Sequence, residues 1–277
     1  CTGLLATSDD GGAGARAARR LLPAGCALAI YDKSTSETPC AFFRAGGDDD
    51  LFGAHDECHS LPNVGREQHT FAHHVAETYD ALPQWLIALP SPTKHDRLAE
   101  LPRLLNATLC GDGLGLHGSG FWCIDRTDSE PSATIEDYDA CRISRYHERA
   151  TVPSEVHPVG AFLDAHLGAL SANTSNRLCR VGVCHYGMFA TTRANLRAHP
   201  RAAYVGLAAT LNSTAAGSAM AEETVYLEWA AAAVYGILDG RAAPECPAGA
   251  RGAFSGRCTN PLETTNDPGG AAVRRGS

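Results

Sequence analysis

The sequence predicts a single α/β domain with a mainly parallel central sheet, flanked by helices and braced by disulfides. Short apolar runs alternate along the chain with stretches whose apolar residues recur at helical spacing, as in sheets joined by crossover helices. With 277 residues, of which 44% are hydrophobic and 19% charged, the chain can bury a full core. Its 11 cysteines include no Cys-x-x-Cys pair, which favours disulfides over a zinc ribbon or a redox motif.

The strands are predicted from short apolar runs that end at Pro, Gly or polar residues. Residues 1–22 are small, polar and rich in Arg, so we expect a stem or arm there. The predicted strands lie at 26–31, 41–44, 85–89 and 180–189. A Pro- and Gly-rich tail is expected at 243–277, which leaves 23–242 for the α/β domain.

The helices are predicted from apolar residues spaced three or four apart. The helix expected at 65–80 repeats Phe71, Val75 and Tyr79 at every fourth position. Asn63 stands where an N-cap would, and Leu82-Pro83 ends this helix. Further helices are predicted at 93–105, 159–170 and 219–238, and one or two at 192–211 around His199-Pro200.

The charge and hydropathy of the chain exclude two classes of partner. A net charge of −8 is unsuited to nucleic acid, whose phosphates need a basic face. The longest apolar run, Trp229 to Leu238, is far shorter than a membrane-spanning helix. We therefore expect neither a nucleic-acid partner nor a membrane span in this segment.

The cysteines and three glycosylation sequons indicate the lumen of the secretory pathway (the Golgi) or the cell exterior. The sequons begin at Asn106, Asn173 and Asn212, in polar stretches that suit loops. Eleven cysteines are too many for an ordinary cytosolic enzyme. No secretory signal precedes Cys1, so we expect that a signal or anchor has been removed.

The segment Leu61-Pro-Asn-Val-Gly-Arg-Glu67 is the most specific motif in the chain. Its Asn-Val-Gly turn feeds a helix N-terminus, where unsatisfied N–H groups and the Arg66 guanidinium can bind an anion. Glu67 in the first helical turn also suits the helix dipole. The spacing alone fits a simpler alternative, a capped helix start with an ion pair between Arg66 and Glu67.

This segment, with Thr70-Phe-Ala-His-His74 and Tyr79-Asp-Ala-Leu-Pro83, resembles the hallmark of an uncharacterised domain-of-unknown-function family. That hallmark is approximately L-P-N-x-G-R-E, followed by Y-x-x-L-P. The run Ala27-Leu-Ala-Ile-Tyr-Asp-Lys33 and a block within 186–204 resemble further parts of the family pattern, and Glu223–Trp229 does so loosely. The resemblance extends over about residues 26–238, with its blocks in the correct order.

The element order of this family is in turn similar to that of nucleotide-sugar glycosyltransferases of the GT-A type, a Rossmann-like fold. This analogy implies transfer of a sugar from a nucleotide donor to a glycan or protein acceptor. Asn63, Gly65 and Arg66 would shape the substrate pocket, and Glu67 or Glu228 would be the catalytic base. His95 and His185 lie near predicted strand ends, where α/β proteins bind ligands.

The metal site of such enzymes has no clear counterpart in the sequence. They commonly hold Mn²⁺ or Mg²⁺ with an Asp-x-Asp at a strand end, because hard cations prefer oxygen ligands. The strand at 85–89 is followed by Pro90-Ser-Pro-Thr-Lys-His95, which has no carboxylate. The acidic run Asp48-Asp-Asp50 precedes the hallmark and is interpreted as a solvated turn. A divalent cofactor is therefore possible without an assigned ligand set.

Other sites are less favoured by the sequence. His69, His73 and Glu77 share one helix face but lack a His-Glu-x-x-His pattern for zinc. The glycines of 111–120 are not followed by Gly-Lys-Ser/Thr, and the chain has no Gly-x-Ser-x-Gly elbow of a serine hydrolase. The alternative to an enzyme is a non-catalytic extracellular glycoprotein that serves as a structural or binding module.

Overall fold

A computed structural model describes residues 1–7, 12–44, 51–89, 101–105, 120–125, 154–156, 159–167, 184–213 and 221–235. The strands in these ranges are β1 (Thr2–Thr7), β2 (Ala27–Asp32), β3 (Glu57–Ser60), β4 (Trp85–Leu89), β5 (Phe121–Asp125) and β6 (Cys184–Thr192). The helices are α1 (Ala13–Leu21), α2 (Ala41–Arg44), α3 (Arg66–Glu77), the 3₁₀ turn η1 (Tyr79–Ala81), α5 (Leu101–Leu105), α7 (Val159–Leu167), α9 (Arg193–Arg197), α10 (Arg201–Ser213), α11 (Glu222–Trp229) and α12 (Ala231–Tyr235).

The six strands form one sheet in the order β3-β2-β1-β4-β6-β5. The pairs β3–β2, β2–β1 and β1–β4 are parallel, whereas β6 runs antiparallel to both β4 and β5. The α/β class is therefore confirmed, but the sheet is mixed and not mainly parallel. An apolar run predicts that a strand is buried, and it carries no information about the strand's direction.

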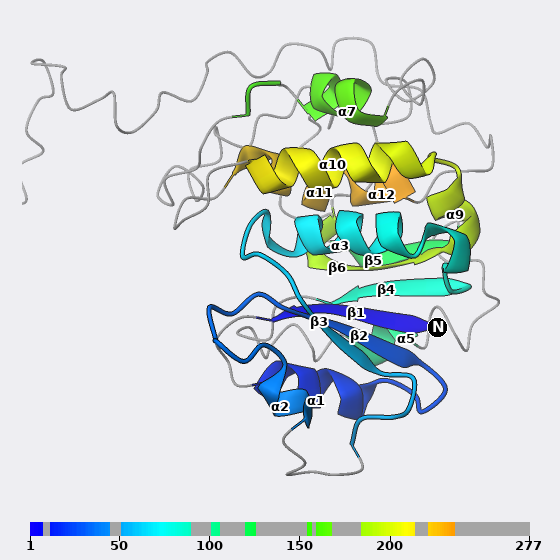
Figure 1. The fold of residues 1–277 in the computed structure, drawn as a ribbon. Coiled ribbons are helices and arrows are strands. Elements are labelled where there is room, and N and C mark those ends of the chain that lie inside the picture. The colour runs from blue at the N-terminus through cyan, green and yellow to red at the C-terminus, as the bar shows by residue number, and fades with distance from the viewer. Residues whose placement is uncertain are drawn as a thin grey trace, which may run out of the picture.

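Helices cover both faces of the sheet (Figure 1). On one face, α3, α7, α10, α11 and α12 build a core with Phe71, Phe189 and Tyr235 at its centre. On the other face, α1 and α5 pack against Leu5, Ile30 and Ile87 of the three central strands. Successive residues of β1 alternate between these two cores, as the period of a strand requires.

The prediction of a stem or arm at 1–22 is wrong, because β1 and α1 lie within these residues. β1 lies in the middle of the sheet, between β2 and β4, and its residues 3–7 are buried. Small residues make this position possible: Ala15 and Ala18 of α1 are completely buried against the sheet. A strand with only two leucines is buried here because neighbours cover both of its faces and both of its edges.

Other element predictions differ in detail from the structure. Residues 41–44 form the short helix α2 and not a strand. The helix expected at 219–238 is two helices, α11 and α12, which meet at Ala230. One or two helices are expected around His199-Pro200, and the structure has two there, α9 and α10. The tail at 243–277 lies outside the described residues.

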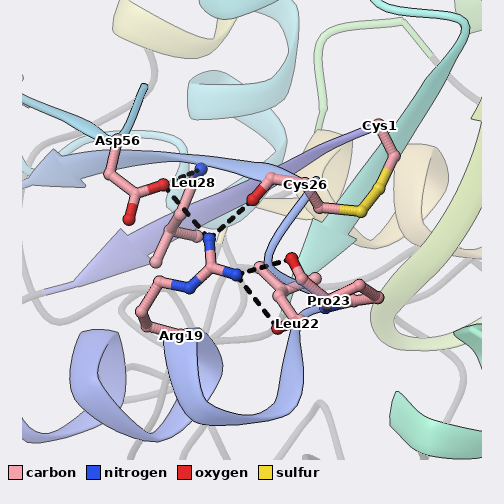
Figure 2. Close-up of a disulfide and its surroundings, with 7 residues drawn as sticks. All are labelled: Cys1, Arg19, Leu22, Pro23, Cys26, Leu28 and Asp56. Carbon is pink, nitrogen blue, oxygen red and sulfur yellow. Dashed lines mark hydrogen bonds and ion pairs between the residues drawn. A yellow bond between two sulfur atoms is a disulfide. The ribbon is translucent and has the colours of Figure 1, made fainter. Parts of the chain in front are cut away.

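Disulfides brace the sheet at the β1–β2 and β2–β3 connections. Cys1–Cys26 joins the residues that precede β1 and β2, and Cys40–Cys58 ties the segment after β2 to β3. Cys123 on β5 is also disulfide-bonded. Next to the first bridge, the buried Arg19 guanidinium donates to three backbone carbonyls and pairs with Asp56 (Figure 2). No helix in the described ranges is long and apolar enough to cross a membrane.

Candidate functional site

The order of the parallel strands creates a switch point between β1 and β4. The chain passes from β1 to β2 and β3 on one side. It then returns through the crossover helix α3 to β4, on the other side of β1. In open α/β sheets, ligands bind outside the carboxyl ends of the strands at such a point. α3 begins at this edge of the sheet, directly after β3 and its turn.

A small cavity lies at this switch point, between α3 and the sheet. Its polar lining comes from the first two turns of α3, and its floor from β1, β4 and β6. The lining residues are Leu4, Ala6, Glu67, Gln68, Thr70, Phe71, Ala88, Leu89, Gly187 and Phe189. The cavity is about the size of one water molecule, and its floor is apolar with a few polar groups around it.

One buried polar side chain in this lining has no hydrogen-bond partner in the described structure. Thr70 is 1% exposed, and its hydroxyl has no hydrogen-bond partner in the described structure. Gln68 is buried beside it, and Gly187 of β6 is so placed that an added Cβ would lie 3.6 Å from the Gln68 Nε2. Buried polar groups are normally satisfied, so an orphaned hydroxyl in a cavity indicates a site for a ligand or water.

The turn before α3 has an unusual backbone that Lys33 holds in place. Gly65 and Arg66 both have left-handed conformations, with φ of 56° and 52°. Lys33, just after β2, donates from Nζ to the carbonyls of Val64 (2.5 Å) and Arg66 (2.7 Å), on either side of Gly65. A left-handed arginine costs on the order of 1 kcal/mol, and such strain is concentrated at functional sites.

Gly65 is required by packing as well as by its backbone conformation. A Cβ at this position would lie 2.6 Å from the Cβ of His69 and 2.8 Å from the Cβ of Leu211 on α10. We expect Gly65→Ala to lower the free energy of unfolding by about 2–3 kcal/mol, from overpacking and left-handed strain together.

Chemical denaturation measures this loss, and Gly206→Ala is the matched control. Gly206 is an exposed residue of α10, with nothing within 4 Å of the added methyl group. Alanine there should raise the stability by about 0.5–1 kcal/mol, through helix propensity. Equal effects of the two substitutions would contradict the close approach of α3 and α10.

The site residues expected from the sequence lie at or near this edge, but only some line the cavity. Glu67 lines it, with its side chain 20% exposed and Oε2 3.5 Å from the Nε of Arg66. Arg66 is 39% exposed at its side chain, so this ion pair is not a buried brace. Asn63 is exposed and is not the N-cap; Gly65 occupies the N-cap position, without a side-chain hydrogen bond.

The remaining predicted residues are scattered over the structure or lie outside its described part. Glu228 is half-buried on α11, and Asn212 is exposed on the last turn of α10. His185 belongs to β6, and only its backbone is described. His95, Asn106 and Asn173 lie outside the described residues, as does the acidic run 48–50.

The described residues do not provide a metal site. No group of three or more His, Cys, Asp or Glu side chains gathers in these ranges, although His69, His73 and Glu77 are all within them. The zinc interpretation of that helix face therefore has no support. A catalytic Mn²⁺ or Mg²⁺ likewise has no ligand set among these residues.

Sequence reasoning missed Thr70, Gln68 and Lys33. An inward-facing threonine on an amphipathic helix resembles an ordinary core residue, and only the surrounding structure shows that its hydroxyl is unpaired. The signal for Lys33 was available: it is one of two lysines in the chain and directly follows a buried strand.

Comparisons of the chain with protein-family models, with curated proteins and with solved structures found no match. The resemblance to the domain-of-unknown-function family therefore stays a prediction. The function must be argued from the geometry of the site.

Proposed function

We propose that this protein binds a nucleotide-sugar at the carboxyl edge of β1, β2 and β4 and transfers the sugar to a glycan or protein hydroxyl. The transfer would take place in the secretory pathway, in agreement with the disulfides. The observation that carries the proposal is the cavity at the β1–β4 switch point, with the orphaned Thr70 hydroxyl facing it.

The chemistry of the cavity suits the hydroxyl-rich part of such a ligand. Thr70 and Gln68 offer neutral hydrogen-bonding groups, and Phe71 and Phe189 provide apolar surface. Glu67 contributes a carboxylate that can accept a proton from an acceptor hydroxyl. In that step the acceptor oxygen bonds to the anomeric carbon, and the bond from that carbon to the diphosphate oxygen breaks.

Thr70→Val tests whether the orphaned hydroxyl serves a ligand. Valine keeps the shape and removes a buried group that has no partner, so the free protein should lose no stability and gain up to about 1 kcal/mol. Binding of a nucleotide-sugar should weaken about tenfold, because a hydrogen bond to the ligand is lost. Calorimetric titration and thermal unfolding measure the two effects.

Thr191→Val is the matched control for this substitution. Thr191 is equally buried, but its hydroxyl donates to the Tyr235 carbonyl at 2.7 Å. Its removal should cost about 1–2 kcal/mol of stability and leave ligand binding unchanged. If Thr70→Val is as destabilising as Thr191→Val, the Thr70 hydroxyl has a structural partner and is not available to a ligand.

Release of a nucleoside diphosphate, with a panel of sugar donors and glycan acceptors, tests the transfer itself. We expect turnover or donor hydrolysis with at least one donor, and its loss in Glu67→Gln. A folded protein that binds no donor would overturn the transferase proposal in favour of a non-catalytic glycoprotein.

A further inference from the structure

Lys33 is a buried cation whose ammonium donates to two backbone carbonyls in the part of the chain that the structure describes. The residue is 3% exposed, and its Nζ donates to the carbonyls of Val64 and Arg66. An ammonium group has three N–H donors, so these two bonds leave the third without a partner among the described residues. The backbone N–H of Lys33 bonds to Thr7, which fixes the side chain at the carboxyl end of β2.

Among the described residues, no carboxylate pairs with this ammonium. Within the described residues, no Asp or Glu oxygen lies within ion-pair distance of Lys33. Burial lowers the pKa of Lys33 to about 8; the nearby Arg66 charge lowers it further and the Glu67 charge opposes this. Buried charges in proteins are normally paired, because removing a cation from water costs several kcal/mol.

The surroundings of Lys33 point toward an anion. The first turn of α3 lies directly against it, and this turn carries N–H groups that the helix itself does not satisfy. The partly exposed Arg66 guanidinium belongs to the same turn. The neighbouring cavity is lined by the Thr70 hydroxyl, which has no hydrogen-bond partner in the described structure.

We propose that Lys33 and the first turn of α3 form the subsite that binds the phosphate groups of the nucleotide. This inference rests on the proposed function and divides its site in two. The uncharged groups of the cavity face the hydroxyl-bearing part of the ligand, and the Lys33 ammonium faces its diphosphate. Hydrogen bonds between a cation and phosphate are about twice as strong as neutral ones, so the subsite should bind a diphosphate without the rest of the ligand.

Inorganic pyrophosphate is the probe, used with the full chain and its disulfides intact. Calorimetric titration should show binding to the unaltered protein, and the midpoint of thermal unfolding should rise with pyrophosphate concentration. Lys33→Met keeps the volume of the side chain and removes the charge. It should weaken pyrophosphate binding at least about tenfold.

Arg197→Met is the control, because it removes one positive charge at the other end of α3, where Arg197 bonds to the Tyr79 and Asp80 carbonyls. It should leave pyrophosphate binding unchanged. If Lys33→Met does not fold, amide NMR of the unaltered protein replaces it. Pyrophosphate should then shift the signals of Arg66, Glu67 and Gln68, and shifts confined to other regions would overturn the assignment.

The outcomes separate this inference from the proposed function. Uridine diphosphate that binds Lys33→Met as tightly as the unaltered protein would overturn the role of Lys33 and leave nucleotide binding standing. Pyrophosphate binding that depends on Lys33, without binding of any nucleotide-sugar, would keep the anion subsite and overturn the transferase. No pyrophosphate binding to the unaltered protein would mean that Lys33 only braces the turn.

Discussion

Arg19→Met should lower the free energy of unfolding by about 3–5 kcal/mol, because it leaves a buried carboxylate without its cation. The Arg19 guanidinium, shown in Figure 2, donates to the carbonyls of Leu22, Pro23 and Cys26 at 2.6–2.9 Å. Its ion pair with Asp56 is 3.2 Å long, and both side chains are nearly inaccessible, at 7% and 2% exposure.

The size of this effect follows from how many segments the network joins. Asp56 also accepts hydrogen bonds from the N–H groups of Leu28 and Gly53. The two side chains thus connect the end of α1, the start of β2 and the approach to β3. Without the cation, three buried backbone carbonyls lose their hydrogen-bond donor, and the Asp56 carboxylate beside them stays buried without a counter-charge.

Urea denaturation with the disulfides intact measures the loss. Arg20→Met is the control, because Arg20 is the exposed neighbour of Arg19 on the same helix and its replacement should change stability by less than about 0.5 kcal/mol. Adding Asp56→Asn to Arg19→Met should recover part of the loss, since no uncompensated charge remains. A loss below about 1 kcal/mol for Arg19→Met would show that the network is open to water.

The parts of the fold that could be predicted are those whose residues carry their own pattern. α3 was predicted within a few residues, because Phe71 and Val75 face the core at helical spacing. β4 was predicted with the same bounds that it has in the structure, since Trp85–Leu89 is an unbroken apolar run buried on both faces. Such unbroken apolar runs are typical of strands in the middle of a sheet.

Two of the missed strands, β1 and β3, have no such pattern, for different physical reasons. β1 contains only two large apolar residues, Leu4 and Leu5, and its burial depends on neighbours that come later in the chain. β3 is an edge strand with three of its four residues exposed, held by pairing to β2 and by the Cys40–Cys58 bridge. Polar edge strands are governed by pairing partners and not by local hydrophobicity.

The backbone structure at the start of the candidate site could be predicted from the sequence, but the side chains that line its cavity could not. The Leu61–Glu67 motif correctly indicated a turn into a helix N-terminus, but it gave no sign of the strand β3 that precedes it. It drew attention to Asn63, which is exposed, and away from Thr70, which faces the cavity. Whether a hydroxyl is unpaired depends on which groups the fold places within hydrogen-bond distance of it, and the sequence alone does not show this.

Acid should destabilise the protein by about 3 kcal/mol for each of His69 and His74 as the pH falls from 6.5 to 4. Both residues belong to α3 and are at most 4% exposed. Burial lowers the pKa of each to about 4, helped by the charges of Lys33 and His73 at His69, and of His59 and His73 at His74. The Nδ1 of His74 lies 3.1 Å from the Tyr31 hydroxyl.

Stability falls with falling pH because the unfolded state binds protons at a higher pH than the folded state. In the unfolded chain both histidines protonate near pH 6.5, whereas in the folded protein they stay neutral to about pH 4. Above pH 6.5 the two histidines are neutral in both states, so their burial does not make the free energy of unfolding depend on pH. Stability is lost as the pH falls through this window, by up to about 1.4 kcal/mol per pH unit for each ring. The lowered pKa of Asp32 adds a separate loss at lower pH.

Denaturation curves at several pH values between 7 and 4 measure this slope. The double substitution His69→Gln/His74→Gln should flatten it, because glutamine does not titrate and can still accept a hydrogen bond from Tyr31. His55→Gln is the control, since His55 is exposed and its replacement should leave the slope unchanged. A free energy of unfolding that stays constant from pH 6.5 to 4.5 would mean that water reaches the rings of His69 and His74 on α3. The helix that carries the first turn of the candidate site would then be loosely packed, and the backbone held by Lys33 would not be a rigid part of it.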